Sequence, residues 1–152
     1  MPEITNTRFG AVSFEEQDII TFPDGVIGFP QCTRFVVVSR SEQSPFRWLQ
    51  SIDLPEFAFL VTDPACYVSN YEPVMGESLS AQLEIGEKTP TLLYTTVSIP
   101  HGSPHNMTLN LAGPIVINVE TRIGRQFIVE DEAYTVKHRA FPTESASERA
   151  AA

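Results

Sequence analysis

Residues 107–118 read Met-Thr-Leu-Asn-Leu-Ala-Gly-Pro-Ile-Val-Ile-Asn, and this stretch decides the fold class. In its first half, Met107, Leu109 and Leu111 alternate with polar or small residues, so the three side chains share one face of an extended chain. Its second half is rich in β-branched residues, which favours a second strand over residues 115–119. Pro114 lies between the halves and excludes a continuous helix. The stretch therefore predicts two short strands with a dry face.

Prolines set the pattern outside this stretch. The chain has 12 of them, and each removes a backbone donor and bars a helix interior, so long helices are excluded. One short helix is predicted over residues 79–85, ending before Gly86. A hairpin turn is predicted at the acidic residues 15–18, and a tight connection at residues 121–125, where Gly124 would supply a positive φ. Further strands are predicted over residues 12–14, 20–22, 35–38, 57–61, 92–99 and 126–129.

These elements predict a mainly β protein. About eight or nine short strands separated by turn signals indicate a small antiparallel β-barrel or a sandwich-like single domain, with one short helix. We expect that domain to span residues 1–142. Residues 143–152 contain no large apolar side chain, so we expect a flexible C-terminal tail.

Charge and targeting signals narrow the classes of function. The 152 residues contain 10 Lys or Arg and 19 Asp or Glu, a formal net charge of −9. This balance argues against direct binding of nucleic acid and favours a basic partner. The sequence has no secretory signal and no apolar run long enough to span a membrane, so we expect a cytoplasmic protein. Cys32 and Cys66 are then free thiols, and we expect both to be small buried hydrophobes.

Motifs for catalysis or cofactor binding are lacking in the sequence. His101 and His105 stand four residues apart, but Gly102 and Pro104 bar the helix that would aim both imidazoles at one metal ion. Neither a nucleophile elbow nor a glycine-rich phosphate loop occurs. We therefore expect no enzyme, no cofactor and no metal, although an enzyme that uses a histidine or Cys66 is the alternative to test.

Acidic and amide side chains are the remaining candidates. Asp53 with Glu56, and the run Glu130-Asp131-Glu132, are each compatible with an acid/base pair or cation site, with a solvated turn, or with an anionic surface that meets a cationic partner. A solvated turn is favoured over an acid/base or cation site, and the sequence does not divide the solvated turn from the anionic surface. Asn110 is predicted on the polar face of its strand, where it is a candidate for binding a partner.

A series of segments, taken in their order along the chain, resembles the bacterial flagellar assembly factor FliW family. Each segment alone is a weak motif of strand and turn, but their order over residues 7 to 141 is specific. The segments are Thr-Arg-Phe-Gly at 7–10, Ile-Ile-Thr-Phe-Pro-Asp-Gly-Val-Ile-Gly-Phe at 19–29, Pro-Phe-Arg-Trp-Leu-Gln-Ser-Ile-Asp at 45–53, Phe-Ala-Phe-Leu-Val-Thr-Asp-Pro at 57–64, Tyr-Glu-Pro at 71–73, residues 107–118 and Gly-Arg-Gln at 124–126.

The resemblance implies a non-enzymatic protein that chooses between two partners. Members of the family are understood to bind flagellin before export and the RNA-binding translational repressor CsrA, so a member would control flagellin translation and flagellum assembly. Partner contacts are then expected at Asp53, Glu56, Asp63, Asn110, Glu130, Asp131 and Glu132. A flagellin export chaperone without a regulatory function is the alternative. We expect a monomer when neither partner is present.

Overall fold

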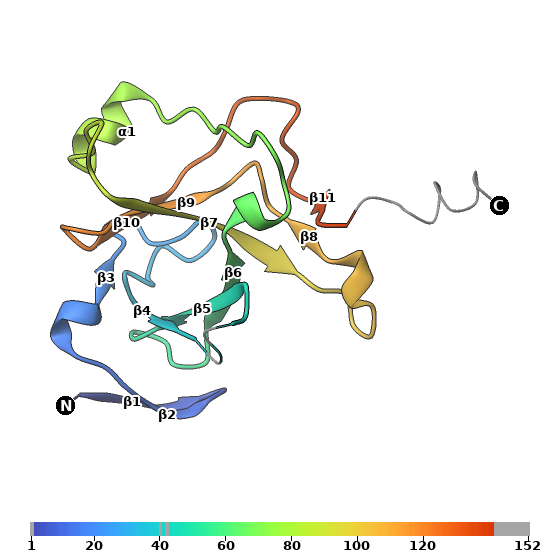
Figure 1. Cartoon of the computed structure of the whole chain (residues 1–152). Helices are drawn as coiled ribbons and strands as arrows, with labels where there is room; N and C mark the ends of the chain where they lie inside the picture. The colour runs from blue at the N-terminus through green and yellow to red at the C-terminus, as the bar shows by residue number, and fades with distance from the viewer. Residues whose placement is uncertain (1, 40, 42, 142–152) are drawn as a thin grey trace.

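The computed structural model describes residues 2–39, 41 and 43–141. It contains eleven strands and one α-helix within this part of the chain (Figure 1). The strands are β1 (Glu3–Thr7), β2 (Gly10–Ser13), β3 (Ile20–Thr21), β4 (Arg34–Val38), β5 (Phe46–Ser51), β6 (Ala58–Thr62), β7 (Thr91–Ser98), β8 (Thr108–Leu109), β9 (Ile115–Asn118), β10 (Ile123–Gln126) and β11 (His138–Arg139), and the helix is α1 (Glu77–Gln82). The expected tail, residues 143–152, lies outside the described residues.

Strand pairing closes the main sheet into a ring. The strands follow the order β11-β8-β7-β6-β5-β4-β3-β10-β9, and β9 pairs again with β7. This closure works because β7 is long: its first half pairs with β9, in the register Leu92 opposite Ile117, while its second half pairs with β6 and β8. All pairs in the ring are antiparallel except β3 with β10. The predicted mainly β fold class with one short helix is confirmed.

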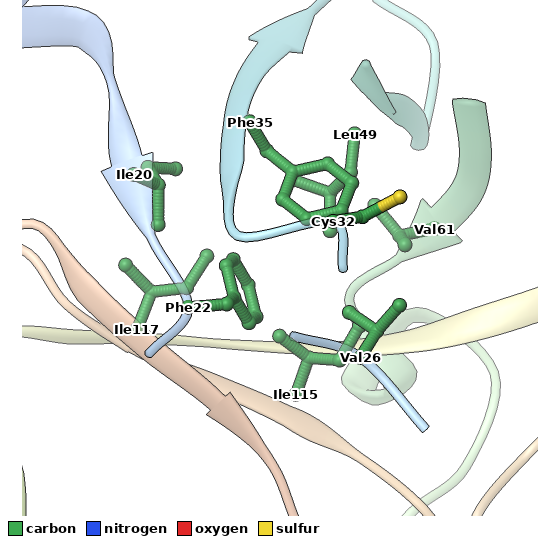
Figure 2. Packing of buried hydrophobic residues seen from close by; sticks show 9 residues of the cluster. All are labelled: Ile20, Phe22, Val26, Cys32, Phe35, Leu49, Val61, Ile115 and Ile117. Carbon is green, nitrogen blue, oxygen red and sulfur yellow. The ribbon is translucent and has the colours of Figure 1, made fainter. Parts of the chain in front are cut away.

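A dry core fills the ring. Figure 2 shows side chains from β3, β4, β5, β6 and β9 converging on one volume. Phe22 and Phe35 meet edge to face there, with ring centroids 5.2 Å apart. Burial of each such side chain contributes about 1.5–3 kcal/mol relative to exposure. The nine buried residues of this cluster are Ile20, Phe22, Val26, Cys32, Phe35, Leu49, Val61, Ile115 and Ile117.

Two smaller clusters extend the core outside the ring. The β1–β2 hairpin, at the bottom of Figure 1, places Ile4 against Phe14 and Val36, so it covers the outer face of β4. In the other cluster, Met107, Leu109 and Leu111 of the deciding stretch are buried with Ala140. The predicted dry face of residues 107–111 is thus confirmed, although only Thr108–Leu109 forms a strand.

Three local predictions are wrong in the structure. Residues 15–18 form no hairpin turn: Glu16–Asp18 is a 3₁₀ helix, because β2 pairs with β1 whereas β3 pairs with β4 and β10. Residues 126–129 are not a strand of their own, since β10 ends at Gln126. Cys66 is exposed, whereas Cys32 is buried as predicted.

The connection at residues 121–125 also differs from the prediction. The residue with positive φ is Arg122, at 61°, and Gly124 lies within β10. A Cβ at Gly124 would lie 2.9 Å from Cζ of Phe22, so glycine permits close packing here and supplies no left-handed turn. The helix, predicted at residues 79–85, is confirmed as an element but begins two residues earlier, at Glu77, and ends at Gln82.

Candidate docking face

One wall of an apolar groove is the loop that follows β3. Its first turn is closed by the Gly25 amide, which donates to the Phe22 carbonyl at 2.8 Å. Gly25 has φ +69°, and a Cβ there would lie 2.5 Å from the Phe29 carbonyl oxygen, so only glycine fits. The turn places Ile27 on the surface, with 54% of its area exposed.

The segment that continues from β10 lies alongside this groove. It runs antiparallel to the stretch before β9, since the Phe127 amide donates to the Pro114 carbonyl at 3.1 Å and the Val129 amide donates to the Ala112 carbonyl at 2.8 Å. Side chains alternate along an extended segment. Val129 is therefore buried, whereas Ile128 points outward and is 63% exposed.

Two amide side chains fix the floor of the groove around Gly113. The Gln126 side chain donates to the Gly113 carbonyl at 2.8 Å and accepts from the Ile27 amide at 2.8 Å, so it ties the wall to the floor. The Asn110 side chain accepts from the Gly113 amide at 2.9 Å. The groove has a volume of about 390 Å³, and Ile27, Phe59, Ile115, Ile128 and Val136 supply most of its apolar lining.

An acidic hollow adjoins the groove. It has a volume of about 780 Å³, and the side chains that line it include Glu72, Val74 and the run Glu130-Asp131-Glu132. Ile128 lines both hollows, so the apolar and acidic surfaces are continuous. We call this surface the docking face and define it by Ile27, Asn110, Gln126, Ile128, Glu130, Asp131, Glu132 and Val136.

Two tyrosines anchor the segment that carries the acids. Tyr71 and Tyr134 pack edge to face with centroids 4.7 Å apart, and the Tyr71 hydroxyl donates to the Leu111 carbonyl at 2.6 Å. Burial, together with the neighbouring Tyr134, raises the pKa of the Tyr71 phenol, so it stays a neutral donor. The Tyr134 hydroxyl accepts from the Glu72 amide at 3.1 Å. The acidic run is thus held on an ordered support.

The predicted partner-binding residues fall into two groups. Asn110, Glu130, Asp131 and Glu132 come together on the docking face. Asp63 lies elsewhere: it caps the 3₁₀ helix Pro64–Cys66 by accepting from the Ala65 amide, and it lines a separate hollow with Arg47. Glu56 is exposed in the connection between β5 and β6 and lines neither hollow of the docking face.

Asp53 is held by contacts within the fold. One carboxylate oxygen accepts from the amides of Thr33 and Arg34, and the other pairs with the Arg34 guanidinium at 3.0 Å. Burial pushes the pKa of Asp53 upward, but the Arg34 side-chain hydrogen bond, the two backbone hydrogen bonds and the Arg34 charge outweigh burial and leave it below its ordinary value. Asp53 therefore joins the start of β4 to the end of β5.

The sequence reasoning missed the apolar half of the docking face. Ile27, Ile128 and Val136 follow the same apolar patterns as core residues, so nothing local distinguishes them as exposed. In the sequence, Gln126 stands out only as the last residue of the segment Gly-Arg-Gln at 124–126, which gives it no role in binding.

Other predicted chemistry finds little support in this part of the chain. His101 and His105 are both exposed: His101 lies in the turn after β7, and His105 lies within the 3₁₀ helix Pro104–Asn106. Among residues 2–39, 41 and 43–141, no three His, Cys, Asp or Glu side chains are grouped to hold a metal ion. The helix that the described residues form is too short to cross a membrane. What the docking face offers is noncovalent binding by apolar, amide and carboxylate groups.

Comparison with known proteins places this chain in a family. The sequence model described as FliW protein matches residues 3–140. This chain belongs to the FliW family. It is 40% identical over 129 residues to the flagellar assembly factor FliW of Magnetococcus marinus, covering 85% of this chain and 80% of that protein.

Further relatives agree across nearly the whole chain. The flagellar assembly factor FliW of Leptospira interrogans is 37% identical, and the match covers 91% of this chain and 93% of that protein. A crystal structure of the flagellar assembly factor FliW superimposes with a TM-score of 0.85 at 32% identity, over 94% of this chain and 99% of that one. The resemblance seen in the ordered segments is confirmed.

Proposed function

We propose that this chain is a non-enzymatic, cytoplasmic flagellar assembly factor that binds flagellin and antagonises the RNA-binding translational repressor CsrA. The observation that carries the proposal is the docking face: exposed apolar side chains continuous with a carboxylate run, on a member of the FliW family. An exposed apolar surface bordered by polar groups is typical of a protein–protein binding site.

The charges of the molecule support the second partner. Among the described residues, the two ion pairs are Arg34 with Asp53 and Arg125 with Asp24, so the carboxylates at 130–132 have no cationic partner within the fold. CsrA is a basic protein, and attraction to an acidic surface raises the association rate and makes binding sensitive to salt. We propose that Glu56, Asp63 and the run at 130–132 contribute to this contact.

Partner exchange would then regulate translation. The free protein binds CsrA and so releases flagellin mRNA for translation. When flagellin accumulates before export, it occupies the protein, CsrA is freed and repression returns. Such exchange requires that one complex disfavours the other by a coupling of at least about 1–3 kcal/mol. We propose that residues 1–142 act as one domain and that the protein is a monomer between partners.

A competition measurement tests the proposal. Purified protein is added to CsrA bound to the leader of flagellin mRNA, and the bound RNA is followed by a mobility shift at two salt concentrations. We expect the protein to release the RNA from CsrA and added flagellin to restore the complex of CsrA with the RNA. The release should weaken at the higher salt concentration. Binding of flagellin without any effect on CsrA would contradict the regulatory function and leave an export chaperone. Metal analysis and assays of Cys66 reactivity on the same preparation test the alternative of an enzyme. A bound metal ion or a reactive thiol would support that alternative.

A further inference from the structure

Three side chains of one extended segment form a line across the docking face. Because Phe127 and Val129 are hydrogen-bonded to the stretch before β9, the side chains of Gln126, Ile128 and Glu130 project to the same side. Four residues of extended chain span about 13 Å, at roughly 3.3 Å per residue. That length corresponds to about nine residues of α-helix, at about 1.5 Å per residue.

The chemistry changes along this line. At the Gln126 end the groove is uncharged and apolar, with Ile27 and Val136 on its sides, of which Val136 is 61% exposed. At the Glu130 end the surface is acidic, and none of its carboxylates is in an ion pair within the described fold. A complementary ligand therefore has apolar side chains at one end and a cation at the other.

The backbone amides of Ile27 and Gly113 at the floor are already hydrogen-bonded. The amides of Ile27 and Gly113 donate to Gln126 and Asn110, and the Gly113 carbonyl accepts from Gln126. At this floor a ligand therefore meets mainly side chains, because these backbone amides have no free hydrogen to donate. Such a surface suits an amphipathic helix. Apolar residues spaced by three and four positions along the helix would form the stripe that lies in the groove.

We infer that the docking face binds one amphipathic helical segment of flagellin, about nine residues long, whose apolar stripe lies over Ile128 and whose Lys or Arg, about one turn further on, pairs with Glu130. The inference rests on the proposed function, because flagellin is a partner there. It also fixes the polarity of the bound segment: its cation lies toward the acidic run.

Single substitutions on exposed positions test the inference without disturbing the core. Binding of monomeric flagellin is measured by calorimetry to the full chain, to Ile128→Ser and to Glu130→Lys. The matched controls are Ile99→Ser, an exposed isoleucine outside both hollows, and Glu87→Lys, which makes the same change in net charge. We expect affinity to fall about tenfold or more in the two test variants and less than about twofold in the controls.

A charge exchange tests the polarity. Peptides of 12 residues tiled across the ends of flagellin identify the bound segment, and its Lys or Arg is replaced by Glu. We expect this peptide to lose binding to the full chain and to recover it with Glu130→Lys, with helical circular dichroism appearing on binding. A bound segment that lacks the apolar stripe and cation, or a charge exchange without rescue, overturns the inference.

The two proposals fail in different ways. If the unaltered chain binds neither flagellin nor CsrA, both proposals are wrong. If flagellin binds equally well to Ile128→Ser, or if only CsrA binding falls in that variant, the inference is wrong and the proposed function stands. Melting temperatures within about 2 °C of the unaltered chain show that loss of binding does not reflect unfolding.

Discussion

The interior of the strand ring and the docking face contain the same kinds of side chain in opposite situations. In the ring, Phe35 and its eight neighbours are wholly or almost wholly buried, and the docking face exposes more than half of Ile27, Ile128 and Val136. Acids differ in the same way: Asp53 accepts hydrogen bonds from two backbone amides and an arginine, whereas the carboxylates at 130–132 pair with no cation of the described fold.

This difference separates residues that determine stability from residues that are available for binding. A buried apolar side chain has already gained its transfer free energy on folding, whereas an exposed one can gain it only against another molecule. The comparison therefore predicts that matched substitutions in the two regions affect different properties. Three matched pairs test it, an apolar pair, an amide pair and an acidic pair.

The apolar pair has the largest expected effect. Phe35→Ala removes a fully buried ring that packs against Phe22 and Phe59, and we expect a loss of about 3–5 kcal/mol in the free energy of unfolding. Ile128→Ser alters an exposed side chain and should change it by less than about 0.5 kcal/mol. Urea unfolding followed by fluorescence measures both. A loss below about 1 kcal/mol for Phe35→Ala would contradict the assignment of this cluster as the core.

The sequence predicts these two regions to different extents. Alternation and proline spacing predicted the strand content, because both report directly on the local backbone. Closure of the ring was not predictable in detail, since the pairing of β7 with β9 joins segments more than twenty residues apart. The false hairpin at residues 15–18 has the same origin: local pattern predicted a turn, but long-range pairing placed β2 and β3 in different sheets.

The docking face was predictable only in Asn110 and its acidic run. Asp and Glu are rarely buried unless they are paired, so the sequence alone pointed to the carboxylates at 130–132. Nothing in the sequence indicates that Ile27 and Ile128 are exposed, because an isoleucine is buried or exposed according to what packs over it. Asp53 differs from these acids in a way that its charge does not reveal: its oxygens accept hydrogen bonds from Thr33 and Arg34 within the fold, and its contact with a partner stays a prediction.

The amide pair has an intermediate expected effect on the free energy of unfolding. Asn118 is buried, donates to the Leu83 carbonyl at 2.7 Å and accepts from the Glu120 amide at 2.9 Å, so it joins the end of α1 to the turn after β9. Asn118→Ala leaves both groups unpaired and should cost about 1–3 kcal/mol. Asn110→Ala removes one partly exposed bond and should cost less than about 1 kcal/mol.

Thermal and urea unfolding of the two variants measure this difference. The Asn110 variant should instead show weaker binding of flagellin, because that side chain lines the groove. Equal losses of stability would mean that the floor of the docking face is as much a part of the folding unit as the ring. The distinction between residues that determine stability and residues available for binding would then not hold for Asn110.

The acidic pair has the smallest expected effect and depends on pH. Because the folded pKa of Asp53 lies below its ordinary value of 3.8, the unfolded state binds the proton more readily. The stabilisation from Asp53 is therefore fully present above the ordinary value and is lost as the pH falls through the lower, folded value. An ion pair with this degree of exposure contributes about 0.2–1 kcal/mol.

Asp53→Asn should accordingly lower the free energy of unfolding at pH 7 by that amount and leave it unchanged at the acidic end of the titration, where the unaltered carboxyl is already protonated. Glu130→Gln should lower the free energy of unfolding at pH 7 by less than Asp53→Asn does, because Glu130 is exposed and is in no ion pair of the described fold. Urea unfolding between pH 7 and pH 2 measures both curves. If Glu130→Gln lowers the free energy of unfolding at pH 7 as much as Asp53→Asn does, the acids of the docking face are stabilised within the fold, and their pairing with a charged partner would contribute less to binding.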